Sequence, residues 1–332
     1  MIPFDLPTQT LTFQCQLERP ILFHFRQDGA TPGTTLAGAF GTALLQVGCL
    51  RQRSGQPRCL GISGEEGFFC PEFADCAFHW LFKPYFLHQN RSPGRPVRLR
   101  APQLETGNPV QNFSLEVALW GRHAVASREV VTDAIRLMGD NGLNHAGEPI
   151  RFRLLDQQVM PISTFQQEIE RLSTVVWQKA LLVFESPLLM QSRATDADGA
   201  STRVTTNSAS FRLESLLGNA AYEIMAWHLE EHPSNEHANR EVRHALCRNQ
   251  RQAAVQALHA SIDDWQPRLV PIDLGQRISR SNGRRFPIRG LLGHVELTGR
   301  INDLLPWLVL LEWLGGGQKR SMGFGATRLW LR

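Results

Sequence analysis

The chain has 332 residues, of which 42% are apolar and 20% are charged. This length and composition are typical of a globular protein with one large or two ordinary domains, which argues against a disordered chain. The formal net charge of +4 is too small to identify a partner, so the placement of the charge carries more information.

Neither a secretory leader nor a membrane span is expected. The first residues, MIPFDLPTQTLTFQ, lack a basic segment followed by an apolar run. The most apolar stretch, LLPWLVLLEWL, is too short to cross a bilayer and contains Glu312. We therefore expect a cytoplasmic protein whose six cysteines are reduced or metal-bound.

The N-terminal half of the chain alternates strands and helices. Strict alternation in NFSLEVALWGR predicts a half-buried strand, with Phe113, Leu115, Val117 and Leu119 on one face. Ser127 is the predicted N-cap of the helix that follows. The other predicted elements are a strand in TLTFQCQLE, a helix over 34–48, a loop in GDNGLNHAGEP and a strand in IRFRLLD.

The C-terminal half shows the same order of elements. Its predicted elements are a strand in VVWQKALLVFESP, a helix in RLESLLGNAAYEIMAWHLEEH, a strand in GHVELTGR, a helix in DLLPWLVLLEWL and a strand in ATRLWLR. In the last helix, Asn302 is the predicted cap and Pro306 is expected in the first turn, where proline is tolerated. A further helix, within about 235–262, has no counterpart in the first half and is interpreted as an insertion.

Strand, Gly-Arg, helix, glycine loop and strand thus occur twice. This repetition predicts an α+β protein with two ferredoxin-like (RRM-like, βαββαβ) domains in tandem. The expected division is a first domain over 1–158, a linker over 159–172 and a second domain over 173–332. Two unrelated β-α-β segments are the alternative interpretation.

Two long polar segments are predicted to be loops. The first, QSRATDADGASTRVTTNSAS, is small and polar, and we expect it to be mobile until something binds. The second, HQNRSPGRPVRLRAP, carries Arg91, Arg95, Arg98 and Arg100. A solvated edge is the favoured interpretation of this arginine run.

A basic hairpin is predicted between 274 and 294. Ser281-Asn282-Gly283 is a tight-turn signal, and five arginines surround it without an acid among them. Such a concentration of charge favours a polyanion such as the RNA backbone, although a solvated edge protected by its charge is the alternative. The five arginines are Arg277, Arg280, Arg284, Arg285 and Arg289.

A glycine-rich loop, 315–325, precedes the last strand. Five glycines, among them Gly317, Gly323 and Gly325, bracket Lys319, Arg320 and Ser321 in GGGQKRSMGFG. Because a helix enters this loop and a strand leaves it, the order is opposite to that of a nucleotide P-loop. An RNA strand lying across the sheet is the favoured explanation, since a plain connection with a glycine cap explains only one or two glycines.

Four cysteines crowd into CLRQRSGQPRCLGISGEEGFFCPEFADC. Cys49, Cys59, Cys70 and Cys76 could hold a structural zinc ion. Their spacing is wide and contains no C-x₂-C pair, so buried inert thiols are the favoured interpretation. No cofactor is expected.

Several of these segments together resemble the RAMP superfamily, in particular the CRISPR-associated endoribonucleases that cut the repeats of precursor guide RNA. The segment GGGQKRSMGFGATRLWL resembles the superfamily's C-terminal glycine-rich signature, and RISRSNGRRFPIRGLLGHVELTG resembles the basic segment before the last β-α unit. TLAGAFGTALLQVGC resembles the first helix, while NFSLEVALWGR and GDNGLNHAGEPIRFRLLD resemble the end of the first domain.

The resemblance implies a repeat RNA, as a hairpin or unstructured, that is cut without a metal ion. The 2′-hydroxyl beside the scissile phosphate would attack, leaving a 2′,3′-cyclic phosphate and a 5′-hydroxyl. It also implies that the protein binds mature guide RNA and other CRISPR effector subunits, without a membrane partner. A non-catalytic RAMP subunit that binds guide RNA as a scaffold is the alternative.

The expected catalytic residues follow from this chemistry. Relatives often carry a histidine in or near the first helix, but the helix over 34–48 contains none. His24, in ILFHFRQ, is therefore the first candidate for the general base, with Arg26 on the same strand face and His145 as second candidate. Lys319 and Arg320 are expected to bind phosphate, and the arginines of the hairpin to hold the RNA.

Overall fold

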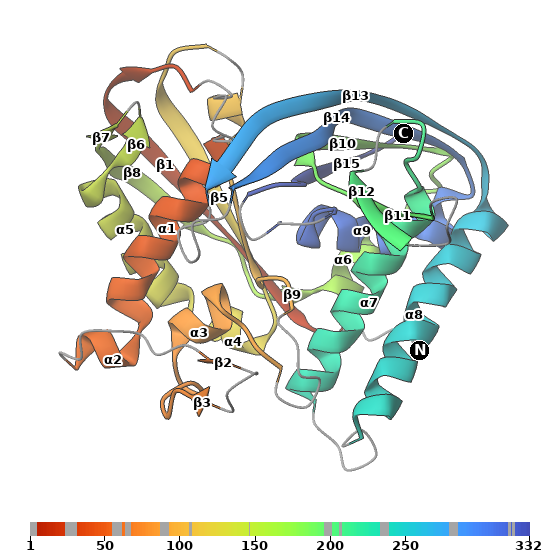
Figure 1. The fold of residues 1–332 in the computed structure, drawn as a ribbon, viewed down its shortest axis with the longest axis horizontal. Helices are drawn as coiled ribbons and strands as arrows, with labels where there is room; N and C mark the ends of the chain where they lie inside the picture. Colours follow the sequence, from red (N-terminus) through yellow and green to blue (C-terminus); the bar gives the residue numbers. More distant parts are fainter. Residues whose placement is uncertain are drawn as a thin grey trace.

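The computed structural model is an α+β molecule with two larger antiparallel sheets (Figure 1). The N-terminal half lies on the left of Figure 1, and the C-terminal half lies on the right. The structure describes residues 5–23, 32–54, 62–63, 68–86, 93–105, 108–145, 147–195, 201–205, 208–232, 239–278, 285–317, 320 and 323–332.

The first sheet is built from the N-terminal half of the chain. Its strand order is β4 (Val97–Arg100), β5 (Val110–Trp120), β1 (Pro7–Ile21) and β8 (Phe152–Val159), and β9 (Ser163–Thr164) extends it beside β1. The alternation predicted for β5 is confirmed, because Phe113, Leu115, Val117 and Leu119 are all buried. They share a core with α1 (Pro32–Gly48) and α5 (Arg128–Asn141), which pack against each other.

The second sheet is built from the C-terminal half. Its strand order is β13 (Ile262–Ile278), β14 (Arg285–Gly299), β10 (Lys179–Leu188) and β15 (Thr327–Leu331). The sheet arches over its helices in Figure 1. Leu182 and Phe184 of β10 lie in one core with residues of α7 (Leu213–Glu231), α8 (Arg240–Ser261) and α9 (Ile301–Leu314).

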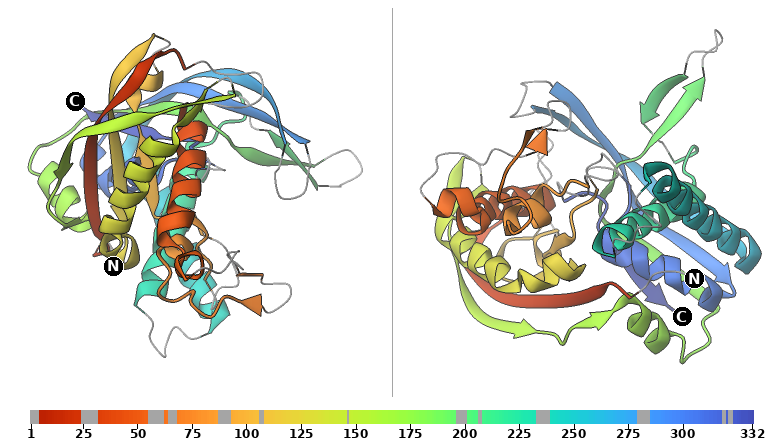
Figure 2. Two further views of the ribbon diagram at one scale, coloured as in Figure 1. Left: turned by 90° about the vertical axis from the view of Figure 1, so that its left-hand side faces the viewer. Right: turned by 90° about the horizontal axis from the view of Figure 1, so that it is seen from below.

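Strands and helices follow one another in the same way in both sheets. In each sheet the first strand along the chain lies between the third and the last, and the second strand forms the edge beyond the third. In the right-hand view of Figure 2, the first sheet and its helices lie beside the second sheet and its helices. The repetition that the sequence indicates is therefore present in the order of the strands.

Shorter elements fill the connections. Near the end of α1 the chain forms α2 (Leu50–Arg53), β2 (Ile62–Ser63), β3 (Phe68–Phe69) and α3 (Ala77–Phe82). The remaining elements are η2 (Pro102–Glu105), α4 (Arg122–Ala126), β6 (Leu143–His145), β7 (Glu148–Ile150), α6 (Phe165–Leu172), β11 (Gln191–Thr195) and β12 (Ser201–Thr205).

The prediction of a loop for the segment GDNGLNHAGEP is wrong. Helix α5 continues to Asn141, and β6 then pairs with β7 as a short hairpin. The glycines explain the difference, since Gly142 has a φ of 81° directly after the helix and Gly147 has a φ of 93° between the strands. The Gly147 amide donates to Asn144 Oδ1 at 3.1 Å, so the polar residues that suggested a loop close a hairpin turn.

Both long polar loops also contain strands. Residues 191–195 and 201–205 pair as β11 and β12, and this hairpin projects from the body in both views of Figure 2. In the arginine run, residues 97–100 form β4, the edge strand of the first sheet. Apolar and basic residues alternate from Val97 to Arg100, which indicates a strand. The pattern spans only four residues, and it follows a segment rich in proline and glycine that is typical of a loop.

The start of the last helix differs from the prediction. Helix α9 begins at Ile301, so Asn302 lies inside it and Pro306 follows its first turn. The Asn302 side chain instead accepts from the Trp177 amide at 2.7 Å and donates to the Val175 carbonyl at 2.8 Å. It therefore fastens the segment before β10 to the helix. The N-cap position predicted for Ser127 is confirmed, since Ser127 directly precedes α5, but its hydroxyl donates to the His123 carbonyl at 2.7 Å rather than capping the helix.

The segment 159–172, the expected linker, contains strand β9 and helix α6. Helix α6 begins with a capping box, in which the Gln167 amide donates to Thr164 Oγ1 at 3.2 Å and the Thr164 amide donates to Gln167 Oε1 at 3.1 Å. Phe165 and Ile169 of this helix are buried in the core of the second sheet. Among the described helices, none is long and apolar enough to cross a membrane.

Candidate functional site

The two halves of the chain touch where two glycine backbones meet. Gly33, in the first turn of α1, faces Gly323 of the glycine-rich loop, and a Cβ on Gly33 would lie 2.7 Å from the Gly323 carbonyl oxygen. A Cβ on Gly323 would overlap the Gly33 carbonyl group. We call this contact and the side chains around it the seam: Gly33, Gly94, Arg95, Arg98, Glu223, Arg320 and Gly323.

The glycine-rich loop is folded tightly onto itself and onto β10. The Gly316 amide donates to the Gly325 carbonyl at 2.7 Å, and the Gly325 amide donates to the Pro187 carbonyl at 3.0 Å. Gly325 has a φ of 68° and is buried, and a Cβ there would overlap the Gly316 carbonyl. A Cβ on Gly317 would overlap the Leu189 carbonyl. Internal backbone packing therefore explains why side chains are excluded here.

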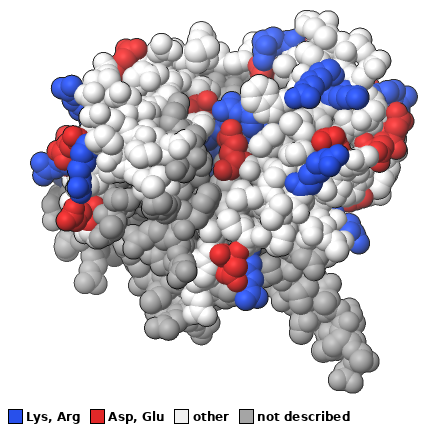
Figure 3. Space-filling model, turned by 90° about the horizontal axis from the view of Figure 1, so that it is seen from above, with Lys and Arg blue, Asp and Glu red and all other residues white. Residues whose placement is uncertain are grey.

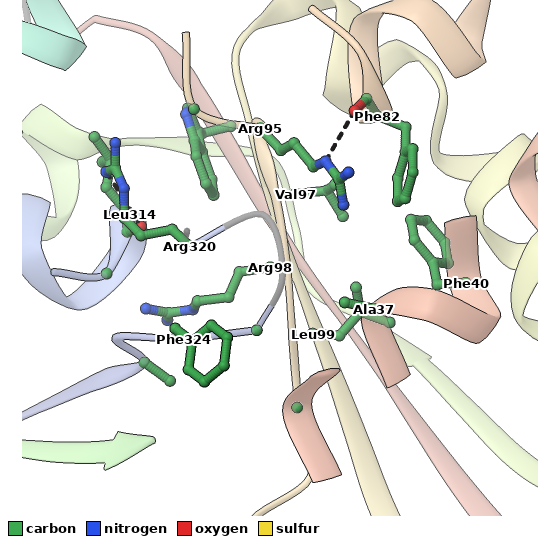
Figure 4. A pocket seen from close by; sticks show the side chains of 16 residues that line it. Ala37, Phe40, Phe82, Arg95, Val97, Arg98, Leu99, Leu314, Arg320 and Phe324 are labelled. Carbon is green, nitrogen blue, oxygen red and sulfur yellow. Dashed lines mark hydrogen bonds between the residues drawn. The ribbon is translucent and has the colours of Figure 1, made fainter. Parts of the chain in front are cut away.

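A small pocket opens at the seam, between the two halves. It contains about 40 Å³ of space, which suits a few water molecules or part of a phosphate rather than a whole nucleotide. The guanidinium groups of Arg95, Arg98 and Arg320 come to it from both halves, and Phe324 lies beside Arg98 (Figure 4). The pocket is therefore cationic, although much of its wall is apolar.

Arg320 pairs with Glu223, the residue that joins the C-terminal half to Gly94 of the N-terminal half. Its Nη2 lies 3.3 Å from Glu223 Oε2, and Nη1 donates to the Leu314 carbonyl at 3.5 Å. Glu223 of α7 also accepts the Gly94 amide of the N-terminal half. Trp227, one turn further along α7, donates its Nε1 to the Gly94 carbonyl at 3.2 Å. The residue expected to bind phosphate is thus held in a mostly buried ion pair.

Arg95 is held by contacts with Phe82 of the N-terminal half. Its Nε donates to the Phe82 carbonyl at 2.8 Å, and its guanidinium lies 3.3 Å from the centre of the Phe82 ring, a cation–π contact. Figure 4 shows the side chain reaching across the pocket wall toward Phe82. Burial lowers the pKa of Arg95 to about 9.

Arg98 is the least satisfied cation of the pocket. Its Nε and Nη1 are buried and have no hydrogen-bond partner among the described residues. Burial lowers the pKa of Arg98 to about 9, while the negative charges of Glu312, Glu116 and Glu185 oppose that shift. Since a buried donor without an acceptor is costly, the guanidinium favours an anionic group placed against it.

The neighbouring arginine is paired with two carboxylates. Arg100 contacts Glu116 at 3.3 Å and also pairs with Glu185 of β10, which in turn lies 3.2 Å from Arg328. Since Val97 and Leu99 belong to the core of the first sheet, Arg98 and Arg100 point to its other face. The solvated edge expected for this arginine run is therefore wrong, because β4 lies against the second sheet.

The basic hairpin is confirmed as a strand pair. Strands β13 and β14 pair antiparallel out to Ile278 opposite Arg285, with Arg277 opposite Phe286. Arg289 is exposed and lies 2.9 Å from Asp273, so its charge is partly balanced. On the face drawn in Figure 3, basic and acidic described residues lie next to one another in small groups.

Six predicted site residues lie outside the described residues: His24, Arg26, Arg280, Arg284, Lys319 and Ser321. Segment 24–31 nevertheless joins β1 to the turn of α1 that carries Gly33. His145 ends β6, opposite Glu148 in the hairpin. The sequence interpretation missed Arg98 and Glu223, for which the only signals were the short alternation in β4 and an acid in an apolar helix.

The cysteine cluster does not form a described metal site. Cys49, Cys70 and Cys76 are buried free thiols, and Cys59 lies outside the described residues. Cys76 Sγ donates to the Gly48 carbonyl at 3.5 Å, and burial raises the pKa of both Cys70 and Cys76. Among the residues that the structure describes, these three thiols are not gathered closely enough to share one ion.

The packing of the glycine loop yields a stability prediction. Replacing Gly325 by alanine puts a Cβ onto the Gly316 carbonyl and should lower the free energy of unfolding by more than about 3 kcal/mol. Gly147 has a similar positive φ but open space around it, so Gly147→Ala is the matched control and should lose only about 1–2 kcal/mol. Urea denaturation measures both, and equal losses would contradict the account of this loop.

The bridge through Glu223 yields a second prediction. Glu223→Gln keeps an acceptor for the Gly94 amide but leaves Arg320 without its anion, and should lower the free energy of unfolding by roughly 3 kcal/mol. The control is Glu168→Gln, which breaks an exposed pair with Arg171 and should change it by less than about 1 kcal/mol. If both variants unfold alike in urea, the ion pair between Glu223 and Arg320 does not stabilise the fold.

Comparison with known proteins agrees with this architecture. Residues 6–181 match a protein-family model described as an N-terminal domain, and residues 182–327 match the model of the CRISPR-associated endoribonuclease Cas6. A comparison with curated proteins gave no match.

Solved structures of Cas6 proteins are similar over the whole chain. The Cas6 (TTHB231) product complex is 14% identical, with a TM-score of 0.52, and the match covers 98% of this chain and 100% of that one. Thermus thermophilus Cas6 (TTHB231) is 13% identical, with a TM-score of 0.47, over 98% of this chain and 99% of that one. The C-terminal half therefore carries a CRISPR-associated endoribonuclease Cas6 domain, which identifies an RNA-cleaving protein of the CRISPR repeat-processing type.

Proposed function

We propose that this protein cuts CRISPR repeat RNA at the seam, by attack of the 2′-hydroxyl on the adjacent phosphate and without a metal ion. The bond from the 2′-oxygen to phosphorus forms as the bond to the 5′-oxygen breaks. The products are a 2′,3′-cyclic phosphate and a 5′-hydroxyl. The observation that carries the proposal is Arg98, whose Nε and Nη1 have no hydrogen-bond partner among the described residues although the group is buried beside the pocket.

Arg98 would stabilise the charge of the transition state. The phosphorane gains negative charge on its non-bridging oxygens, and a preorganised guanidinium in a site of low dielectric constant stabilises that charge strongly. Arg95 and Arg320 already have protein partners, so their proposed role is to add positive potential and to define the pocket wall. Lys319 and Ser321 adjoin Arg320 in the sequence and are proposed to contact the flanking phosphates.

His24 is the proposed general base. It lies in segment 24–31, which leads directly into the first turn of α1, and Gly33 of that turn lines the pocket. Arg26 shares this segment, and His145 is the second candidate for the base. A histidine with an ordinary pKa is matched to removing the proton from the 2′-hydroxyl near neutral pH.

The remaining RNA contacts are proposed for the basic hairpin. Its two strands extend to the turn that carries Arg280 and Arg284, between Arg277 and Arg285, with Arg289 further along β14. RNA held by this hairpin would remain bound after the cut, so the product could pass to other effector subunits. Cleaved repeat RNA and mature guide RNA are thus the proposed partners.

Two ferredoxin-like domains in tandem are the proposed architecture behind this site. The support is the common strand order of the two sheets, in which the first strand along the chain lies between the third and the fourth. We propose the division 1–158 and 173–332, with the segment 159–172 connecting them and α8 inserted in the second domain.

Cleavage chemistry gives the direct test. Repeat RNA incubated with the protein in EDTA should be cut, whereas RNA with a single 2′-deoxy at the cut site should bind equally well and remain intact, because it lacks the nucleophile. Mass analysis of the products should find the cyclic phosphate. Binding of both RNAs without cutting would instead support a scaffold subunit, and cutting of the deoxy strand would overturn the mechanism.

Single-turnover rates test the residue roles. Arg98→Met should reduce the rate of cutting by about 10²–10³-fold, because the charge of the transition state loses its buried donor. His24→Ala should reduce it by about 10²–10⁴-fold. Arg136→Met is the matched control, since Arg136 is an exposed arginine of α5 paired only with Asp133 among its described partners, and it should cut normally. A normal rate in Arg98→Met would remove the seam from the mechanism.

A further inference from the structure

A second group of ligand-type side chains lies away from the pocket, at the C-terminal end of α7. His228 lies in the last turn of α7, His232 directly follows the helix, and Asp5 precedes β1. His228 Nδ1 lies 3.2 Å from Asp5 Oδ1, and His232 Nε2 lies 3.8 Å from Asp5 Oδ2. One nitrogen or oxygen from each residue falls within 4.8 Å of the others.

These distances fit a tetrahedral metal ion. Ligands at about 2.0–2.2 Å from Zn²⁺ lie roughly 3.3–3.6 Å from one another. Two imidazoles and one carboxylate form a common ligand set for zinc, with water in the fourth position, whereas Mg²⁺ and Ca²⁺ prefer oxygen ligands only. Small movements of the exposed Asp5 side chain would bring all three atoms to such distances.

The surroundings support an ion rather than a simple ion pair. The His232 Nε2 atom is buried and has no hydrogen-bond partner among the described residues. The two imidazole rings lie 4.6 Å apart between centroids, so both face the same space. Protonating both rings to match Asp5 would place two like charges there, while one divalent ion satisfies both nitrogens and the carboxylate.

Neighbouring groups hold this arrangement in place. Glu231 accepts the Arg122 amide with both carboxylate oxygens at 2.8 Å, which joins the end of α7 to the start of α4. Arg122 Nη2 lies 3.2 Å from His232 Nδ1. Because a guanidinium can only donate, this contact favours the tautomer with its proton on Nε2, which opposes metal binding at that atom.

We propose that Asp5, His228 and His232 bind a zinc-class divalent ion that clamps the segment before β1 to α7. The ion would fix the C-terminal end of the helix whose middle carries Glu223, about 7.5 Å away along the helix axis. Its role is structural, and it does not depend on the cleavage mechanism proposed above. His228 would bind through Nδ1 and His232 through Nε2, while Glu231 keeps the helix end in register.

Calorimetry of the full-length, metal-stripped protein tests the proposal. ZnCl₂ should bind at this site, whereas MgCl₂ should give no binding heat. Asp5→Asn, His228→Gln and His232→Gln should each weaken zinc binding at least about tenfold. The control His259→Gln changes an exposed histidine of α8 and should leave the affinity unchanged. Circular dichroism of each variant checks that it folds.

Two further results distinguish this site from the cysteines. Cobalt bound here should give the visible absorption of a tetrahedral ion without the near-ultraviolet thiolate band that cysteine ligands produce. Arg122→Ala should bind zinc more tightly than the wild type, because His232 is then free to carry its proton on Nδ1. Absence of zinc binding, a thiolate band, or wild-type affinity in the three ligand variants would overturn the proposal.

Discussion

The contact between Gly33 and Gly323 is the constraint on which the rest of the structure depends. Backbones approach so closely only where neither residue has a side chain, and this approach brings the start of α1 against the glycine-rich loop. The loop reaches that position because Gly325 and Gly316 close it internally and the Gly325 amide is fixed to β10. A sequence signature that suggests contact with a ligand is thus first a device for joining two halves of one chain.

Close backbone contact has an electrostatic consequence. The contact at the seam removes several arginines from water. Their guanidinium groups differ in how many hydrogen bonds and ion pairs they form with the protein. Arg100 has a carboxylate partner from the other half of the chain, Glu185, so this pair contributes to holding the halves together. Arg320 pairs with Glu223 within the C-terminal half. Arg98 feels acidic charge nearby, yet its Nε and Nη1 have no hydrogen-bond partner among the described residues. A buried guanidinium with unused donors lowers the stability of the fold. The same group is already positioned to stabilise a phosphate that becomes more negative as it reacts.

Much of the fold could be predicted from the sequence, because its long elements have clear periodicity. The buried face of β5 and the helices α1, α7 and α8 follow from apolar spacing alone. Short elements could not be found in this way. Strand β4 has only four residues, and its outward residues are arginines, which normally indicate solvent. Their burial depends on a second sheet that is distant in the sequence.

For the candidate site too, features within a short stretch of sequence could be predicted, and contacts between distant residues could not. Local chemistry identified the glycine-rich loop and the basic hairpin, since glycine and arginine counts are visible in short windows. The pairing of Arg320 with Glu223 was not visible, because the two residues are almost a hundred positions apart and meet only in the folded C-terminal half. Likewise, the spacing of His228 and His232 on one helix indicates a ligand pair only when Asp5 is brought beside them.

The most direct measurement of the central claim is a structure of the full-length protein bound to a repeat RNA that carries a 2′-deoxy at the cut site. The account expects the scissile phosphate at the mouth of the seam pocket, with a non-bridging oxygen about 2.8 Å from a nitrogen of Arg98. A scissile phosphate bound elsewhere, with Arg98 still without a phosphate partner, would contradict it.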